Sequence, residues 1–272
     1  MKKIAVIFSF LLALAPVAQP QEIFEALRKG DVPAVKALIE KSPQLLEMRD
    51  SDGDTPLHYA AHGGSAELVN YFIDKGAKLE LLNAEMKTSL HLAAINDRRE
   101  AVSVLLKRGA ALETRDDYGR TALILCARER GQATTGRILI EAGADVNAVD
   151  KFGSTALELA AWRGKADFVD LLLDKGAKLP QGRQSWGGLL SLSAEKGLAN
   201  LFRRLIDGGP DLKAVDSSGS WLLQAAAAGG SAEIVGLLIE KGFDPGKPDR
   251  FGWMPLHYAA RDGRTDAARI LI

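Results

Sequence analysis

Short segments with a helical spacing of apolar residues follow one another along this chain. Leu68, Val69, Phe72 and Ile73 have the i, i+1, i+4, i+5 spacing of one buried helical face. Apolar residues with a similar spacing return at 102–106, 201–206 and 235–239. The pattern predicts a series of short helices, each of which buries one face against a neighbour.

A turn and a different kind of helix precede each of these segments. Gly53 permits a left-handed turn, Thr55 is a good N-cap residue and Pro56 suits the first helical position. A leucine and two alanines then give the helix a narrow apolar face, and two glycines end it. Residues 52–64 are therefore predicted to form one tight turn followed by one short helix.

This unit recurs with a period of about 33 residues. Further copies begin at Lys87, Gly119, Gly153, Gly219 and Gly252. A fixed period of this length, with one turn and two helices per unit, is typical of solenoid proteins. Because each unit of a solenoid packs only on its neighbours, we expect one elongated domain.

The sequence Thr-Pro-Leu-His-Tyr-Ala-Ala at 55–61, closed by Gly76 and Ala77, resembles the ankyrin repeat. The resemblance covers roughly residues 21–272. It implies an all-α repeat solenoid of about eight units including an N-terminal cap, each a helix-turn-helix with a β-hairpin tip. The expected units are 21–49, 50–82, 83–115, 116–149, 150–180, 181–215, 216–247 and 248–272, the last of them incomplete.

Four units depart from the pattern. Met86 replaces the turn glycine, so we expect a less regular tip in the third unit. The fourth unit has one extra residue, which we place near 128–130, between its helices. The sixth unit lacks the Thr-Pro pair and the histidine, which predicts the weakest interface in the stack. The eighth unit stops at Ile272 inside its second helix, and we expect a fragment rather than an end that packs on a partner.

The N-terminus has a different pattern. A basic start, Met1–Lys3, precedes an apolar run of 12 residues, Ile4–Ala15, and then small residues. This order predicts a secretory signal peptide over 1–18, cleaved after Ala15 or Ala18. The run is shorter than the roughly 20 residues that span a bilayer. We expect a bacterial exported type of protein, periplasmic or secreted, with no membrane contact after cleavage; the alternative is an N-terminal core helix.

Charge and cysteine content narrow the possibilities. The chain carries 35 basic and 35 acidic side chains among its 272 residues, so its net charge is zero. A general binder of nucleic acid or anionic membrane would need a basic excess, so we expect neither partner. The single cysteine, Cys126, excludes a disulfide within the chain, and its place in the alanine pair of the repeat predicts a buried, inert thiol.

The histidines do not indicate a catalytic or metal site. His58, His91 and His257 occupy the same position of the repeat. The resemblance implies that each ring bridges neighbouring turns through hydrogen bonds. Rings that belong to different repeats cannot share one metal, whose ligands lie about 2 Å from a common centre. The sequence also lacks the common motifs of hydrolases, zinc proteases, redox enzymes and phosphate-binding loops, so we expect no enzyme, no cofactor and no metal.

Aromatic and arginine residues stand where a partner would bind. The resemblance implies that ligands meet the tips and the exposed face of each first helix. Trp and Arg are the residue types most enriched in binding hot spots. The candidate protein-binding residues are Tyr118, Arg120, Arg128, Phe152, Trp162, Arg163, Trp253 and Arg261. For Tyr118 and Phe152, packing against the neighbouring tip is an open alternative.

These features predict a non-enzymatic protein–protein interaction module. We expect an exported scaffold or inhibitor, a monomer, that binds a partner protein of unknown identity through its concave groove. Two alternatives remain open. The chain can be the regulatory ankyrin portion of a longer protein, or the irregular sixth unit can form a small-molecule or enzymatic site around Arg183, Trp186 and Glu195.

Overall fold

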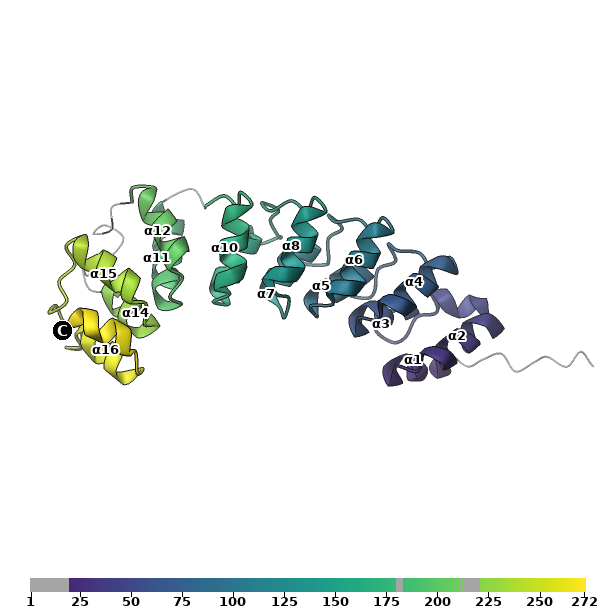
Figure 1. Ribbon diagram of the computed structural model, residues 1–272. Helices are drawn as coiled ribbons and strands as arrows, with labels where there is room; N and C mark the ends of the chain where they lie inside the picture. Colours follow the sequence, from purple (N-terminus) through teal and green to yellow (C-terminus); the bar gives the residue numbers. More distant parts are fainter. Residues whose placement is uncertain (1–19, 180–182, 211, 213–220) are drawn as a thin grey trace, which may run out of the picture.

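Helices follow one another in pairs through the computed structural model, which describes residues 20–179, 183–210, 212 and 221–272 (Figure 1). The first helices of the pairs are α1 (Pro20–Lys29), α3 (Pro56–Gly63), α5 (Ser89–Ile95), α7 (Ala122–Arg128), α9 (Ala156–Trp162), α11 (Arg183–Glu195), α14 (Trp221–Gly229) and α16 (Pro255–Arg261). The second helices are α2 (Val32–Lys41), α4 (Ala66–Asp74), α6 (Arg99–Lys107), α8 (Ala133–Glu141), α10 (Ala166–Asp174), α12 (Ala199–Asp207), α15 (Ala232–Glu240) and α17 (Thr265–Leu271). A short 3-10 helix, η1 (Pro43–Glu47), follows α2.

The pairs stack side by side into a curved array. Figure 1 shows first helices such as α3, α5, α7 and α16 along the lower, concave edge, and second helices such as α4, α6 and α8 along the upper edge. The predicted fold class, an all-α repeat solenoid, is confirmed. No helix in the described part of the chain has the length and apolarity needed to cross a bilayer. The predicted signal peptide, residues 1–18, lies outside the described residues.

Small residues allow the first helices to approach one another. The paired alanines Ala60 and Ala61 of α3 and Ala93 and Ala94 of α5 are all buried. In the second helices, the predicted apolar face packs inward, with Phe72 fully buried in α4. One continuous core therefore runs through the described helices from α1 to α17.

The tips of the units are turns rather than β-hairpins. Within the described residues the structure contains no strand, and Val149 and Thr155 form only an isolated antiparallel bridge. In the second unit, an Asp50 carboxylate oxygen accepts the backbone N–H groups of Asp52 and Asp54, each at 2.9 Å. Aspartate therefore organises the turn through the same local hydrogen bonds that make it common in turns.

The expectation of an irregular tip at Met86 is wrong. Met86 adopts a left-handed φ of 57°, and its N–H donates to the carbonyl of Asn83 at 3.0 Å. Gly53 makes the equivalent bond to Asp50 at 3.1 Å with a φ of 76°. The third tip keeps the geometry of its neighbours because Asn83 replaces the aspartate and accepts the same backbone N–H groups.

Two repeat histidines bridge neighbouring units as predicted. His58 Nδ1 accepts the backbone N–H of Thr55 at 3.1 Å, so its Nε2 carries the proton and donates to the Lys87 carbonyl at 3.0 Å. His91 repeats this arrangement with Thr88 and the carbonyl of Thr114. Burial lowers the pKa of both rings, so both are held neutral.

The predicted buried thiol is also confirmed. Cys126 has no exposed surface, and burial raises its pKa to about 12. A thiol that stays protonated is a poor nucleophile. Cys126 thus acts as a small apolar residue of the core.

Candidate protein-binding surface

Trp162 and two arginines form a cluster at the end of α9. The Trp162 side chain is 57% exposed, because it follows the buried alanine pair and projects beyond the interface between first helices. The Arg163 guanidinium lies over its ring, 4.8 Å from the centroid, and Arg163 Nε donates to the Arg128 carbonyl at 2.8 Å. The structure therefore brings Trp162, Arg163 and the backbone of Arg128 together, and two contacts hold the Arg163 guanidinium in place.

Two aromatic tips lie beside this cluster in the sequence and stack on each other. The rings of Tyr118 and Phe152 have centroids 6.4 Å apart and an interplanar angle of 29°. Both side chains remain exposed, Phe152 at 74%. The rings of Tyr118 and Phe152 do pack against each other, which was the alternative to a binding role, and both side chains are still exposed.

Arg120 does not belong to the exposed set. Its side chain is buried and its guanidinium forms an ion pair with Asp116, 2.7 Å between Nη2 and Oδ2, with a second bond from Nε at 2.8 Å. The same guanidinium lies 4.3 Å from the centroid of the Tyr118 ring. The prediction of Arg120 as a binding residue is therefore wrong in its geometry: the side chain folds back to hold its own turn.

A second cluster surrounds Arg261 at the end of α16. Its guanidinium lies 5.9 Å from the ring centroid of Trp253 and 5.1 Å from that of Tyr258. Two bonds of 2.8 and 2.9 Å join it to the carboxylate of Asp262. The Tyr258 hydroxyl donates to Asp249 at 2.6 Å, which raises the pKa of the tyrosine and lowers that of the aspartate. Trp253 and Arg261 thus lie close to each other, and Tyr258, Asp249 and Asp262, which the sequence analysis did not single out, make further contacts around them.

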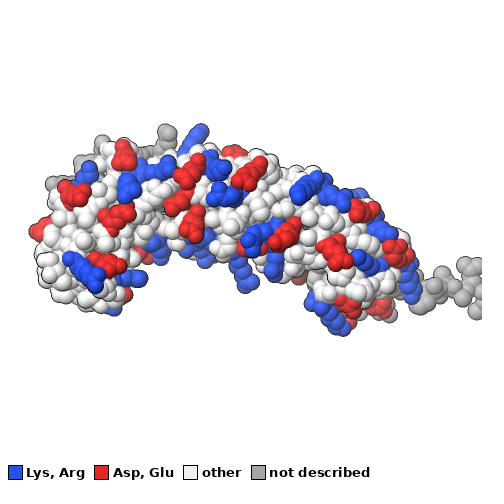
Figure 2. Space-filling model, viewed as in Figure 1, with Lys and Arg blue, Asp and Glu red and all other residues white. Residues whose placement is uncertain are grey.

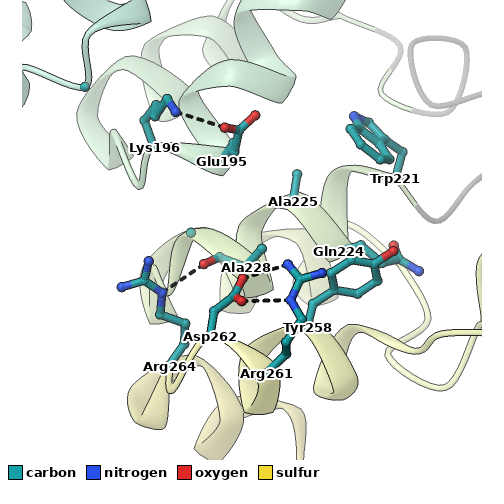
Figure 3. A pocket seen from close by; sticks show the side chains of 12 residues that line it. Glu195, Lys196, Trp221, Gln224, Ala225, Ala228, Tyr258, Arg261, Asp262 and Arg264 are labelled. Carbon is teal, nitrogen blue, oxygen red and sulfur yellow. Dashed lines mark hydrogen bonds and ion pairs between the residues drawn. The ribbon is translucent and has the colours of Figure 1, made fainter.

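A hollow of about 620 Å³ opens beside this cluster, across α11, α14 and α16 (Figure 3). Its lining is Gly164, Glu195, Lys196, Trp221, Gln224, Ala225, Ala228, Gly229, Tyr258, Arg261, Asp262 and Arg264. Sequence reasoning placed only Glu195 and Arg261 near a site. The signal it passed over is Trp221, a tryptophan at the position where other units have the capping threonine, followed by a run of alanines.

The residues suggested for a site in the sixth unit are described only in part. The described residues include no group of three or more His, Cys, Asp or Glu side chains placed to hold a metal ion. Of the residues suggested for a site in the sixth unit, Glu195 lines the hollow and pairs with Lys196 at 2.9 Å. The side chains of Arg183 and Trp186 lie outside the described residues.

Charge is mixed over the surface. Figure 2 shows basic and acidic side chains interspersed over most of the visible face, with Lys and Arg projecting along the concave edge below the middle of the array. Arg128 contacts Glu129 at 3.4 Å, so part of this basic charge is neutralised locally. Within the described residues, the surface therefore carries no large region of one sign of charge in this view.

Comparison with known proteins finds ankyrin repeats along most of the chain. A family model described as "Ankyrin repeats (3 copies)" matches residues 23–116, 110–181 and 190–272. The chain is 34% identical over 61 residues to the palmitoyltransferase AKR1 of Gibberella zeae, 36% over 61 residues to the 2-5A-dependent ribonuclease of Mus musculus, and 34% over 65 residues to the probable E3 ubiquitin-protein ligase XBOS32 of Oryza sativa subsp. japonica. These matches cover 22%, 22% and 24% of this chain, but only 8%, 8% and 13% of the relatives.

Proposed function

The chain belongs to the ankyrin repeat family, and from that premise we propose that it is a non-enzymatic module whose concave face binds a partner protein. The observation that carries the proposal is the exposed Trp162 ring under a guanidinium fixed by the neighbouring unit. With 57% of its surface exposed, this large aromatic side chain packs only partly on the stack. Its burial by a partner would add apolar contact area and would exclude water from the existing cation–π contact with Arg163.

Preorganisation favours binding at this surface. Arg163 is held by Trp162 and by the Arg128 carbonyl, so a partner has little side-chain freedom to remove there. Tyr118 and Phe152 are likewise held by their mutual stacking. A rigid stack that presents fixed aromatic and arginine side chains supports a role in recognition.

We place the protein outside the cytoplasm, as an exported monomeric scaffold or inhibitor in the periplasm or beyond. The basic start and 12-residue apolar run of the N-terminus support this location. An inhibitor would cover one enzyme in the same compartment, whereas a scaffold would hold a partner without blocking it.

A regulatory role within a longer protein is the second candidate. It is favoured by one observation: in each curated relative, the matched segment is at most 13% of the whole protein. In that case the concave face would bind a partner or substrate on behalf of another domain, and any catalytic activity would belong to that other domain.

Binding through Trp162 can be tested with a partner captured from the periplasmic fraction and then purified. We expect Trp162→Ala to weaken the measured affinity by roughly 30-fold, about 2 kcal/mol, as hot-spot truncations do. The urea midpoint of unfolding should stay nearly unchanged, because the ring is exposed. Arg137→Ala, an exposed change on the second helix α8, is the matched control and should bind normally. Unchanged affinity with a large loss of stability would overturn the proposal for this cluster.

A further inference from the structure

The hollow on the concave face exists because one unit has small residues where its neighbours have large ones. Ala228 stands at the position that holds Trp162 in α9, Glu195 in α11 and Arg261 in α16. Ala225, Ala228 and Gly229 form the floor of the hollow, and Trp221 and Gln224 are the other lining residues of α14. Figure 3 shows Ala225 and Ala228 between the side chains of the two flanking first helices.

Glycine brings the floor close to the neighbouring helix. A Cβ added at Gly229 would lie 2.4 Å from the carbonyl oxygen of Ala194 and 2.7 Å from that of Glu195. The close approach of α14 to α11 therefore requires glycine at this position. These three residues offer only methyl groups and backbone to the hollow, whereas Gln224 adds a buried side-chain oxygen, Oε1, that has no hydrogen-bond partner within the described residues.

The charged groups of the rim are paired with one another. Glu195 contacts Lys196 at 2.9 Å on one wall, and Asp262 receives two bonds from Arg261 on the other (Figure 3). Arg264 Nε donates to the carbonyl of Ala228 at 2.9 Å. A carboxylate that enters the hollow would have to compete with the carboxylates that Lys196 and Arg261 already contact, whereas Arg264 contacts a carbonyl. An ammonium group would have to compete with Lys196 and Arg261 for Glu195 and Asp262.

Aromatic rings complete the lining. Trp221 is 56% exposed at the first position of α14, and the Tyr258 ring contributes from α16. Aromatic rings associate by offset or edge-to-face contacts with centroids roughly 4.5–7 Å apart. The volume of about 620 Å³ is within the range of sites that enclose most of a small ligand.

We propose that this hollow is a subsite that seats an aromatic side chain of the partner protein, with an indole or phenyl ring over Ala225 and Ala228 and against Trp221 and Tyr258. The inference rests on the proposed function, since it assumes a partner on the concave face. It adds a second anchor point on α14, two units from Trp162, and names the chemistry of the side chain that enters.

The test uses N-acetyl-L-tryptophanamide as the probe and the alanine methyl signals of the full chain as the readout. We expect the probe to shift the methyl signals of Ala225 and Ala228 with a dissociation constant of about 1–10 mM, as befits a single side chain. N-acetyl-L-glutamate amide should shift them at least tenfold more weakly. No movement of these two methyl signals at about 20 mM probe, or equal movement with the glutamate compound, would overturn the inference.

Two variants identify the contacts. Ala228→Leu fills the hollow from a partly exposed position, and Trp221→Ala removes an exposed wall. Each should weaken probe binding at least fivefold while the urea midpoint stays close to that of the wild type. Ala84→Leu, at an exposed alanine on the third tip, is the matched control and should bind the probe normally. Normal probe binding by Ala228→Leu would contradict the assignment.

The same variants separate this inference from the proposed function. With the captured partner, Ala228→Leu should lower the affinity at least tenfold, while Ala84→Leu should not. If the partner binds Ala228→Leu with unchanged affinity but loses Trp162→Ala, the hollow is not a subsite and the concave-face function stands. If neither variant affects a bound partner, the concave-face function itself fails, and probe binding then reports a hollow that this partner does not use.

Discussion

Met86 holds a backbone conformation that glycine holds in the sister turns. Its φ of 57° compares with 76° for Gly53, 75° for Gly119 and 77° for Gly153. A side chain in the left-handed region costs roughly 1–2 kcal/mol per residue. The hydrogen bonds of Asn83 to the N–H groups of Glu85 and Lys87, at 3.0 and 2.9 Å, keep the turn in place despite that cost.

Met86→Gly should therefore raise the free energy of unfolding by about 1 kcal/mol, since the turn geometry is already built and only the strain is removed. Gly153→Ala is the reverse experiment, because a Cβ added there meets nothing within 4 Å and adds the left-handed strain alone. That variant should lose about 1 kcal/mol. Urea unfolding of both proteins checks the pair, and a loss of stability in Met86→Gly would contradict the assignment of strain.

Single residues also mark the limits of prediction from sequence. The repeat position assigned Trp162 and Arg163 correctly to an exposed surface, because the stack buries the alanine pair and leaves the next positions outside. Arg120 occupies a position that was expected to be exposed, yet its long side chain reaches its own Asp116. Sequence position fixes where a Cα lies, whereas the direction of a flexible side chain depends on partners that only the structure shows.

At the scale of the helix, close contacts between units rest on particular glycines. Gly136 in α8 faces Phe168 of α10, and an added Cβ would lie 2.4 Å from the ring. Gly236 in α15 also lies within a helix, but an added Cβ there meets nothing within 4 Å. Two glycines with the same helical conformation thus differ only in what surrounds them.

This contrast predicts opposite outcomes for the same substitution. Gly236→Ala should stabilise the protein by up to about 1 kcal/mol, the helix propensity difference between the two residues. Gly136→Ala should destabilise it by roughly 1–3 kcal/mol, because the Phe168 ring cannot retreat from a packed core without opening space. Thermal or urea unfolding of the two variants measures both. A stabilised Gly136→Ala would show that the interface between α8 and α10 is looser than the structure indicates.

For the extra residue of the fourth unit, the sequence predicted its position but not the contacts that stabilise it. Its place after α7 was predicted from the shifted glycine, and the structure has the longer connection at Glu129–Gln132. The group that stabilises this connection comes from the next unit: the Lys165 ammonium donates to the carbonyls of Cys126, Glu129 and Gly131 at 3.1, 2.6 and 2.7 Å. The sequence alone could not predict these three bonds of Lys165, because they depend on the conformation of the loop that the side chain reaches.

Across the whole molecule, the repeat period was sufficient to predict a stack of helix pairs, because each unit contacts only its neighbours. The hollow over α14 was missed, since it depends on the difference between three adjacent units rather than on any one of them. The weakness expected of the sixth unit stays a prediction. Polar contacts do join it to the fifth, including Asn200 Nδ2 to Asp170 Oδ1 at 3.0 Å and Arg204 to Asp174 at 3.0 Å.

The repeat position of His58 makes different polar contacts in different units. His58 and His91 each donate to a carbonyl of the next unit, at 3.0 Å. At the same repeat position, Ile124 is apolar and Glu158 bonds instead to Thr155 of its own unit. Gln224 takes the histidine's place in α14 and donates to the Lys247 carbonyl at 3.4 Å. Histidine links between units, at this repeat position, are therefore found in the N-terminal half of the described stack.

Acid should consequently weaken the stack through these two histidines. Burial lowers the pKa of both rings in the folded protein, while in the unfolded chain each titrates near 6.5. Below that pH the unfolded state binds more protons than the folded state, so the free energy of unfolding falls as the pH falls. The stability that the two neutral rings contribute is fully present only above about pH 6.5.

A His58→Gln, His91→Gln double variant tests this. It places at both positions the amide that this chain already has at Gln224, which can donate to the same carbonyls without titrating. Between about pH 7 and pH 5.5, the wild type should lose roughly 1–2 kcal/mol more than the double variant in urea unfolding. Carboxylates such as Asp54 titrate in both proteins, so the difference between their curves of unfolding free energy against pH reports the histidines. Parallel curves would show that the two rings are not the source of the acid sensitivity.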